Sequence, residues 1–240
     1  CRIIYETFDS NEIMYTKYMS GNSYDIMVPS EYMIERMIKE DLLQPIDKAL
    51  VPNLKNINKG ILGQSFDPGN NYWVPYFCGN VGILYDKKIV DKEDLEEGWN
   101  ILRNPKYRGQ IYMYDSERDS FMVALKALGY SMNTTKEREI NEAYQWLLEQ
   151  REEMNPVYVG DESIDTMISG VKAMAIMYSG DAAAVMSENP NMGYYMPKEG
   201  TNVWFDGFVI SKECKQTKLA NEFINYMISD KVSYKNTVEV

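Results

Sequence analysis

Short apolar runs alternate with amphipathic stretches along most of this chain. A run rich in β-branched and aromatic residues between turn residues is typical of a buried strand, whereas apolar residues at i and i+4 are typical of a helix. We expect strands at 1–8, 24–28, 72–85, 110–114, 174–177, 194–196 and 208–210. We expect helices at 11–19, 31–39, 121–128, 137–152, 182–186 and 218–229. Because strands and helices alternate, the pattern predicts an α/β fold with largely parallel sheets.

The longest extended run, 72–85, contains Gly79 near its middle. With 240 residues, the chain has room for one large domain or for two lobes. A strand of this length can pass from one lobe to another and bend at the glycine. The pattern therefore indicates a lobe crossing near Gly79.

The charge balance narrows the class of ligand. Lysine and arginine number 25 against 36 acidic residues, which gives a net charge of −11. Such an acidic chain argues against binding the phosphates of nucleic acid and is compatible with attracting cations. Hydrophobic residues make up 45% of the chain, which is enough for real cores, and no apolar run approaches the ~20 residues needed to span a bilayer.

The absence of histidine excludes several kinds of active site. Ser-His-Asp and Cys-His catalysis and most zinc sites require that residue. The three cysteines, Cys1, Cys78 and Cys214, are far apart and show neither metal-ligand spacing nor a disulfide framework. We interpret Cys1 as an ordinary residue that opens a strand and not as a lipidated N-terminus.

Aromatic and acidic side chains gather where the expected strands end. In open α/β sheets, ligands bind at the carboxyl ends of the strands. An aromatic face attracts an organic ammonium ion, and a carboxylate accepts charged hydrogen bonds from it. Because this combination recurs at four strand ends, it predicts a site for an organic cation. The candidate ligand-binding residues are Ser30, Tyr32, Asp115, Ser116, Asp119, Tyr178, Trp204 and Asp206.

Spacing adds detail at two of these positions. Trp204 and Asp206 lie two residues apart in an extended segment, so their side chains share one face. Asp115 and Asp119 lie four apart at a helix start, which can put both on one face of the helix. The alternative role of these two acids is a favourable interaction with the helix N-terminus. Ser30 precedes another expected helix and can cap it.

Two other kinds of site are compatible with individual residues. Paired carboxylates can hydrolyse glycosides, but nothing here distinguishes a protonated acid from an ionised one. The adjacent Tyr194 and Tyr195 are the feature that suggests a ferric iron carrier. Neighbours in a strand face opposite ways, however, and no histidine is available as a co-ligand.

Six short segments, weak when taken singly, become specific through their order and spacing. They are Asp9-Ser10-Asn11-Glu12-Ile13-Met14-Tyr15, Tyr24-Asp25-Ile26-Met27-Val28-Pro29-Ser30, Tyr72-Trp73-Val74-Pro75-Tyr76, Asn104-Pro105-Lys106-Tyr107-Arg108-Gly109, Ala124-Leu125-Lys126-Ala127-Leu128-Gly129-Tyr130-Ser131 and Pro197-Lys198-Glu199-Gly200. With them, nearly the whole sequence resembles the polyamine-binding proteins of bacterial ABC importers, the spermidine/putrescine-binding family.

This resemblance implies a two-lobe clamp of the type II periplasmic-binding-protein kind, with two hinge crossings. We expect the crossings near Gly79-Asn80 and near Asp206-Gly207. Lobe one would comprise 1–79 plus 207–240, and lobe two would comprise 80–206. The resemblance places the ligand in the cleft between the lobes, which would close by a hinge motion.

The resemblance also implies roles for the candidate residues. Asp119 matches an acid that grips an amine, and Tyr178 matches an aromatic against the methylene chain. Trp204 matches the stacking tryptophan, and Asp206 the principal acid at one end of the polyamine. The residues matched in lobe one are Ser30 and Tyr32.

Some positions depart from the family pattern. Ser116 stands where a spermidine binder has an acid, so one amine contact is expected to move to Asp115 or to be lost. Gly160 replaces a hydroxyl residue. The family also has a strand before Cys1 and a segment after Val240, so we expect a trimmed or partial form with an incomplete site.

The function implied is that of an extracytoplasmic solute-binding protein, either periplasmic or anchored at the cell surface. It would capture spermidine or putrescine and deliver it to the membrane permease of an ABC importer. We expect a monomer with no nucleic-acid partner, no metal, no cofactor and no enzymatic activity. A carrier for another cationic solute, and an enzyme or regulatory effector domain on the same clamp, are the alternatives.

Overall fold

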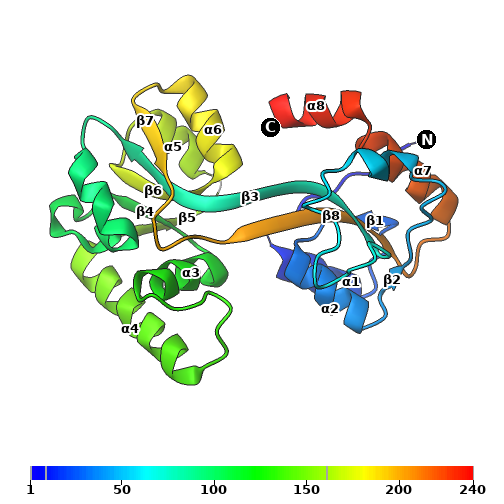
Figure 1. Ribbon diagram of the computed structural model, residues 1–240, viewed down its shortest axis with the longest axis horizontal. Helices are drawn as coiled ribbons and strands as arrows, with labels where there is room; N and C mark the ends of the chain where they lie inside the picture. The colour runs from blue at the N-terminus through cyan, green and yellow to red at the C-terminus, as the bar shows by residue number, and fades with distance from the viewer. Residues whose placement is uncertain (1, 9, 161, 240) are drawn as a thin grey trace. The chain divides into compact units, whose positions relative to one another are not determined.

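The computed structural model describes residues 2–8, 10–160 and 162–239, which form two compact units (Figure 1). Unit 1 contains the described residues up to Cys78 together with Trp204–Glu239, and unit 2 contains Gly79–Val203. The interpretation of Cys1, and the first residue of the motif that begins at Asp9, fall outside the described residues.

Unit 1 is built on strand β8 (Val203–Ser211). It pairs antiparallel with β1 (Ile26–Met27) and β2 (Leu43–Gln44), and β3 (Trp73–Asp86) is its other neighbour. The remaining elements of this unit are α1 (Asn11–Met19), α2 (Glu31–Lys39), the 3-10 helix η1 (Pro52–Asn56), α7 (Thr217–Met227) and α8 (Asp230–Glu239).

Alternation along the strands separates two cores within unit 1. Trp73 and Val209 pack with the buried faces of α1 and α2, whereas Val74 and Ile210 pack with Ile224 of α7. Successive side chains of a strand point to opposite faces, so each strand supplies both cores.

Unit 2 contains the larger part of the sheet. Its strands follow the order β3, β6 (Met174–Tyr178), β4 (Ile111–Tyr114) and β5 (Val157–Val159), and β7 (Met192–Tyr195) also pairs with β3. The other elements are the 3-10 helices η2 (Lys92–Arg103) and η3 (Pro105–Tyr107), and the α-helices α3 (Glu117–Ala127), α4 (Glu137–Met154), α5 (Ser163–Ile168) and α6 (Ser179–Glu188).

Helices cover both faces of the unit 2 sheet (Figure 1). Ile176 faces the core that includes residues of α3 and α4, and its neighbours Ala175 and Met177 face the core that includes residues of α5 and α6. Strands buried on both faces are continuously apolar, which is why Met174–Met177 lacks polar alternation.

The four tryptophans differ in burial. Trp73 and Trp99 are fully buried and Trp146 is 5% exposed. Trp204 is only half-buried, at the start of β8.

Most expected elements are present, but two expectations need correction. The strand at 1–8 is wrong for the described residues 2–8, where Ile4 and Tyr5 are 87% and 84% exposed. An apolar run forms a strand only where a neighbouring strand accepts its hydrogen bonds.

The sheets are mixed and not largely parallel. In the ladders that are described, β3 and β8 pair antiparallel with their partners, while β4 is parallel to β5 and β6. Helices α5 and α8, strands β2 and β5 and the 3-10 helices were not among the expected elements.

The unit boundaries also differ from the lobes expected from the sequence. Trp204 and Asp206 were expected in lobe two, and both belong to unit 1. The N–H of Gly207 donates to the carbonyl of Pro29 at 3.2 Å, and a Cβ on Gly207 would lie 2.4 Å from Trp73 Cε3. The backbone at the expected second crossing is therefore packed inside unit 1.

Candidate functional site

In unit 2, the carboxyl ends of β4 and β6 bring two tyrosines together. The ring of Tyr114 stacks on that of Tyr178 with centroids 4.5 Å apart and an interplanar angle of 26°. The backbone N–H of Tyr178 donates to the Tyr114 hydroxyl at 2.9 Å. Because β4 and β6 are parallel neighbours, their last residues meet at one edge of the sheet.

Helix α3 begins beside this pair and fixes Asp119 in its first turn. Ser116 is the N-cap, and its hydroxyl oxygen accepts the N–H of Asp119 at 3.3 Å. This is the usual geometry of a serine cap, which satisfies one unpaired donor of the helix. Asp119 is consequently buried, at 6% exposed.

The Asp119 carboxylate is surrounded by neutral donors. Oδ2 accepts from the hydroxyls of Ser116 at 2.9 Å and Tyr178 at 2.8 Å, and Oδ1 accepts from Asn202 Nδ2 at 3.2 Å. Burial, followed by the charge and hydrogen bond of Asp119, raises the pKa of the Tyr178 phenol. The phenol thus stays protonated and donates to the acid. We call Ser116, Asp119, Tyr178 and Asn202 the Asp119 cluster.

Asp115 lies outside the Asp119 cluster. It is exposed just after β4, and its backbone N–H donates to the carbonyl of Val159 at 3.0 Å. Its position four residues before Asp119 does not put both acids on one helical face, because the helix begins after Ser116.

In unit 1, Ser30 and Asp206 come together from distant parts of the sequence. They form an isolated antiparallel bridge, and the Ser30 hydroxyl donates to Asp206 Oδ1 at 2.7 Å. Asn11 locks the serine, since its Nδ2 donates to Ser30 Oγ at 3.1 Å and its Oδ1 accepts the Ser30 N–H at 2.9 Å. We call these three residues the Asp206 cluster.

The expected capping role of Ser30 is only half right. Ser30 is the N-cap residue of α2, but its side chain makes no capping hydrogen bond. The hydroxyl is directed to Asp206 instead, so it supports a carboxylate and not a helix end.

The environment of Asp206 disfavours its charged form. Burial raises the pKa of the Asp206 carboxyl, the nearby Glu31 carboxylate raises it further, and the hydrogen bond from Ser30 acts in the opposite direction. Glu31 is held at this point because its Oε2 accepts the N–H of Phe205 at 3.1 Å.

The remaining two expected residues flank the Asp206 cluster along the chain. Trp204 precedes Asp206 by two residues in β8, so their side chains share a face of the strand. Tyr32 lies in the first turn of α2, and its hydroxyl donates to Glu12 Oε1 at 2.9 Å. Both aromatic residues are half-buried.

Sequence reasoning missed two members of these clusters, Asn11 and Asn202, and two residues that lie beside them, Glu31 and Tyr114. Their contacts join segments far apart in the chain, as with Asn202 and Asp119, which are 83 positions apart. The sequence offered a signal only for Asn202, which lies two residues before Trp204 and four before Asp206.

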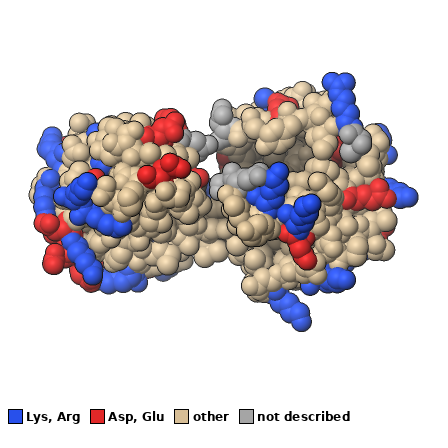
Figure 2. Space-filling model, turned by 90° about the horizontal axis from the view of Figure 1, so that it is seen from above, with Lys and Arg blue, Asp and Glu red and all other residues tan. Residues whose placement is uncertain are grey.

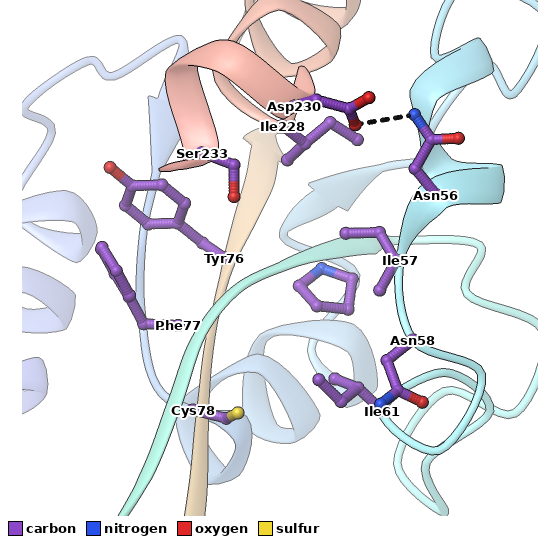
Figure 3. Close-up of a pocket in the computed structure, with 11 residues that line it drawn as sticks. Asn56, Ile57, Asn58, Ile61, Tyr76, Phe77, Cys78, Ile228, Asp230 and Ser233 are labelled. Atoms are coloured by element: carbon purple, nitrogen blue, oxygen red, sulfur yellow. Dashed lines mark hydrogen bonds between the residues drawn. The ribbon is translucent and has the colours of Figure 1, made fainter. Parts of the chain in front are cut away.

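The larger of the two described surface pockets lies elsewhere in unit 1. It has a volume of about 410 Å³ and is lined by β3, the segment after η1 and the start of α8 (Figure 3). Asp230 and Asn56 face each other across it through a hydrogen bond of 3.1 Å. None of the eight expected ligand-binding residues is among the described residues that line it.

Among its described residues, the face shown in Figure 2 carries no patch of a single charge sign. On the face shown in Figure 2, basic and acidic side chains are interspersed over both units. None of the described helices is long and apolar enough to cross a membrane.

Comparison with known proteins gives a consistent result. The family model described as bacterial extracellular solute-binding protein matches residues 22–235. The spermidine/putrescine-binding periplasmic protein of Escherichia coli strain K12 is 32% identical over 235 residues, which cover 97% of this chain and 67% of that protein.

Solved structures agree with the sequence comparison. The spermidine/putrescine ABC transporter substrate-binding protein PotD of Streptococcus pneumoniae has 38% identity and a TM-score of 0.82, with 98% of this chain and 73% of that chain covered. A putative spermidine/putrescine ABC transporter from Listeria monocytogenes has 38% identity and a TM-score of 0.87, with 96% and 71% covered.

These matches confirm the expected α/β periplasmic-binding-protein fold and the resemblance on which it was based. They also remove the enzyme alternative, because the matching family binds solutes for transport and its members act outside the cytoplasm. The chain belongs to the bacterial extracellular solute-binding protein family.

Proposed function

We propose that this chain captures a linear polyamine, such as putrescine or spermidine, for the membrane permease of an ABC importer. The names of its relatives in Escherichia coli and Streptococcus pneumoniae specify spermidine and putrescine. The chemistry of the two clusters supports the same class of ligand.

One observation carries the proposal: in each unit, one of the candidate residues is a largely buried carboxylate with no ion-pair partner among the described residues. Asp119 and Asp206 accept hydrogen bonds from neutral groups, and no Lys or Arg within the described residues forms an ion pair with either. A buried carboxylate without a cation is costly. An ammonium group of a polyamine supplies the cation that such an acid lacks.

Aromatic residues accompany both carboxylates. Tyr178 stacks on Tyr114 beside Asp119, and Trp204 shares a strand face with Asp206. Their faces suit methylene groups and attract the flanking ammonium ions. A neutral or anionic solute would supply no positive charge to either acid.

The magnitudes are sufficient for useful affinity. A cation–π contact contributes about 0.5–2 kcal/mol and a hydrogen bond to a charged group about 1.5–3 kcal/mol. A few of each, less the costs of ordering and desolvation, give a binding free energy of about −8 kcal/mol, which corresponds to micromolar affinity.

Calorimetry with putrescine and with spermidine tests the proposal. The matched control ligand is 1,4-butanediol, which has the same carbon chain as putrescine and no charge. We expect micromolar binding of the amines and none of the diol. Equal affinity for the diol would contradict the proposed recognition of ammonium groups.

Two variants localise the binding. Asp119→Asn and Asp206→Asn are each expected to weaken putrescine binding tenfold or more, since each removes a charged partner. Asp41→Asn removes one negative charge at an exposed ion pair with Lys212 and is expected to leave the affinity unchanged. If all three variants bind like the parent, the assigned residues do not form the site.

The proposal includes a monomeric state, no nucleic-acid partner and two hinge crossings, one near Gly79-Asn80 and one near Asp206-Gly207, where the unit boundary falls between Val203 and Trp204. Light scattering of the loaded and empty protein checks the first of these. Small-angle scattering with and without putrescine checks whether ligand binding changes the overall dimensions, as hinge closure requires.

A further inference from the structure

Asn202 reaches the Asp119 cluster with an amide whose orientation is fixed. The residue is 8% exposed, and its Oδ1 accepts the backbone N–H of Val81 at 3.0 Å within a fully buried environment. Thr201 Oγ1 lies 3.3 Å from the same oxygen. The Thr201 hydroxyl donates its proton to the Val81 carbonyl. Because the carbonyl oxygen of the Asn202 amide accepts the Val81 N–H, the Nδ2 group is left to face Asp119.

This contact differs from the other two on Asp119. The hydroxyls of Ser116 and Tyr178 can rotate toward another acceptor. The Asn202 amide cannot turn without leaving the Val81 N–H unsatisfied in the core, which is costly for a buried backbone group. Asn202 is therefore the rigid member of the Asp119 cluster.

Asn202 also occupies a distinctive place in the chain. It is followed by β8 (Val203–Ser211), and Val81 lies in β3 (Trp73–Asp86), the two strands whose residues belong to both units. The unit 2 boundaries fall at Gly79 and Val203, within two residues of each partner. The Asn202 amide thus contacts both Val81, near the start of unit 2, and the Asp119 carboxylate. Asn202 itself lies near the end of unit 2.

We propose that Asn202 is a positioning residue, which holds the Asp119 carboxylate in the orientation that receives an ammonium group. Asn202 need not touch the ligand, and it acts through Asp119. This inference rests on the proposed polyamine binding, and it adds a residue that sets how strongly unit 2 grips the amine.

A double-mutant cycle with putrescine as the probe tests the proposal. Asn202→Ala is expected to weaken putrescine binding about tenfold in calorimetry, the size expected for a lost hydrogen bond to a charged group. In an Asp119→Asn background, the same substitution is expected to change the affinity less than twofold, because the group that it positions is no longer a carboxylate.

Asn189→Ala is the matched control within unit 2. Like Asn202, the Asn189 side chain accepts a backbone N–H, that of Asn191 at 3.0 Å, but it donates to the Ile168 carbonyl at 2.9 Å and not to a carboxylate. We expect this variant to lower the thermal midpoint as Asn202→Ala does, but to keep the parental affinity. Equal effects of the two variants on affinity would reduce Asn202 to a structural role.

Folding is checked by circular dichroism before each titration. If Asn202→Ala does not fold, Asn202→Ser, which keeps a small polar group in the core, takes its place in the same cycle. The proposal is overturned if the folded variant binds putrescine like the parent, or if its loss is undiminished in the Asp119→Asn background. Failure of the parent to bind any polyamine would instead overturn the proposed function, so the two failures are distinguishable.

Discussion

The hydroxyl of Ser30 donates a 2.7 Å hydrogen bond to the carboxylate of Asp206 across 176 positions of sequence. Asn11 holds Ser30 through two further hydrogen bonds. The largely desolvated carboxylate of Asp206 therefore accepts a hydrogen bond from the neutral Ser30 hydroxyl, and Asn11 determines the position of that hydroxyl.

Removing that hydroxyl should affect ligand binding. Ser30→Ala is expected to raise the pKa of Asp206 further, because the hydrogen bond from Ser30 is the interaction that lowers it. Putrescine affinity at pH 7 should fall about three- to tenfold, in line with about 1 kcal/mol for one hydrogen bond. Calorimetry at pH 5 and pH 7 measures both effects. Ser229→Ala, which removes a local hydroxyl bond to the Tyr226 carbonyl, is the control and should bind normally.

Asp206 should lower the stability of the empty protein at neutral pH. Its folded-state pKa is raised above the unfolded value, so its favourable contribution is present below the unfolded pKa and is lost as pH rises through the folded pKa. Asp206→Asn is expected to raise the thermal midpoint at pH 7 by about 2–4 °C, the effect of about 1 kcal/mol in a chain of this size. This increase in the thermal midpoint should become smaller as the pH falls to 4. An increase that is constant with pH would contradict the raised pKa of Asp206.

The same shift predicts how ligand binding depends on pH. An ammonium ion binds the ionised carboxylate, so putrescine affinity should fall on acidification through the raised pKa of Asp206. The midpoint of this loss should lie above the usual range of an aspartic acid. Titrations between pH 4 and 7 check it, and in Asp206→Asn the corresponding step should be absent.

Tyr178 should contribute in two separable ways. Tyr178→Phe removes the 2.8 Å hydrogen bond to Asp119 and keeps the ring stacked on Tyr114, so putrescine affinity should fall only a few-fold. Tyr178→Leu removes the aromatic face as well and should cost about a further 0.5–2 kcal/mol. Tyr144→Phe, at a residue 48% exposed on α4, is the control. Equal affinities for the two Tyr178 variants would exclude a contribution from the ring.

Gly207 should tolerate no side chain. A Cβ there would lie 2.4 Å from Trp73 Cε3 and 2.9 Å from the Val74 carbonyl oxygen. Gly207→Ala is therefore expected to destabilise the protein by about 1–3 kcal/mol through overpacking. Gly180→Ala is the matched control, since nothing lies within 4 Å of its Cβ position and alanine favours the helix α6. Urea unfolding of both variants compares them, and equal midpoints would contradict the packing argument.

Local sequence signals were sufficient for many of the elements. The helices at 11–19 and 31–39 match α1 and α2 at both ends, because a serine precedes each and the buried positions follow helical spacing. The run 72–85 corresponds to β3, whose apolar residues face two cores as the continuous apolar pattern indicates.

Features that depend on distant partners were not predictable. The apolar character of residues 2–8 was read correctly, but whether a strand forms depends on a neighbouring strand. Similarly, no local pattern shows that Ser30 donates to Asp206 and does not cap α2 with its side chain. Asn202 was overlooked because its importance comes from contacts with Asp119 and Val81, each more than 80 positions away.

The uneven burial of the tryptophans gives this protein its own optical reporter. Trp73, Trp99 and Trp146 lie in the cores and are at most 5% exposed. Trp204 alone among the four is half-buried, and it lies two residues from Asp206. A colourless diamine that stacks on this indole would change the intrinsic fluorescence mainly through one residue. The emission of Trp204 would then report occupancy of the Asp206 cluster without a label.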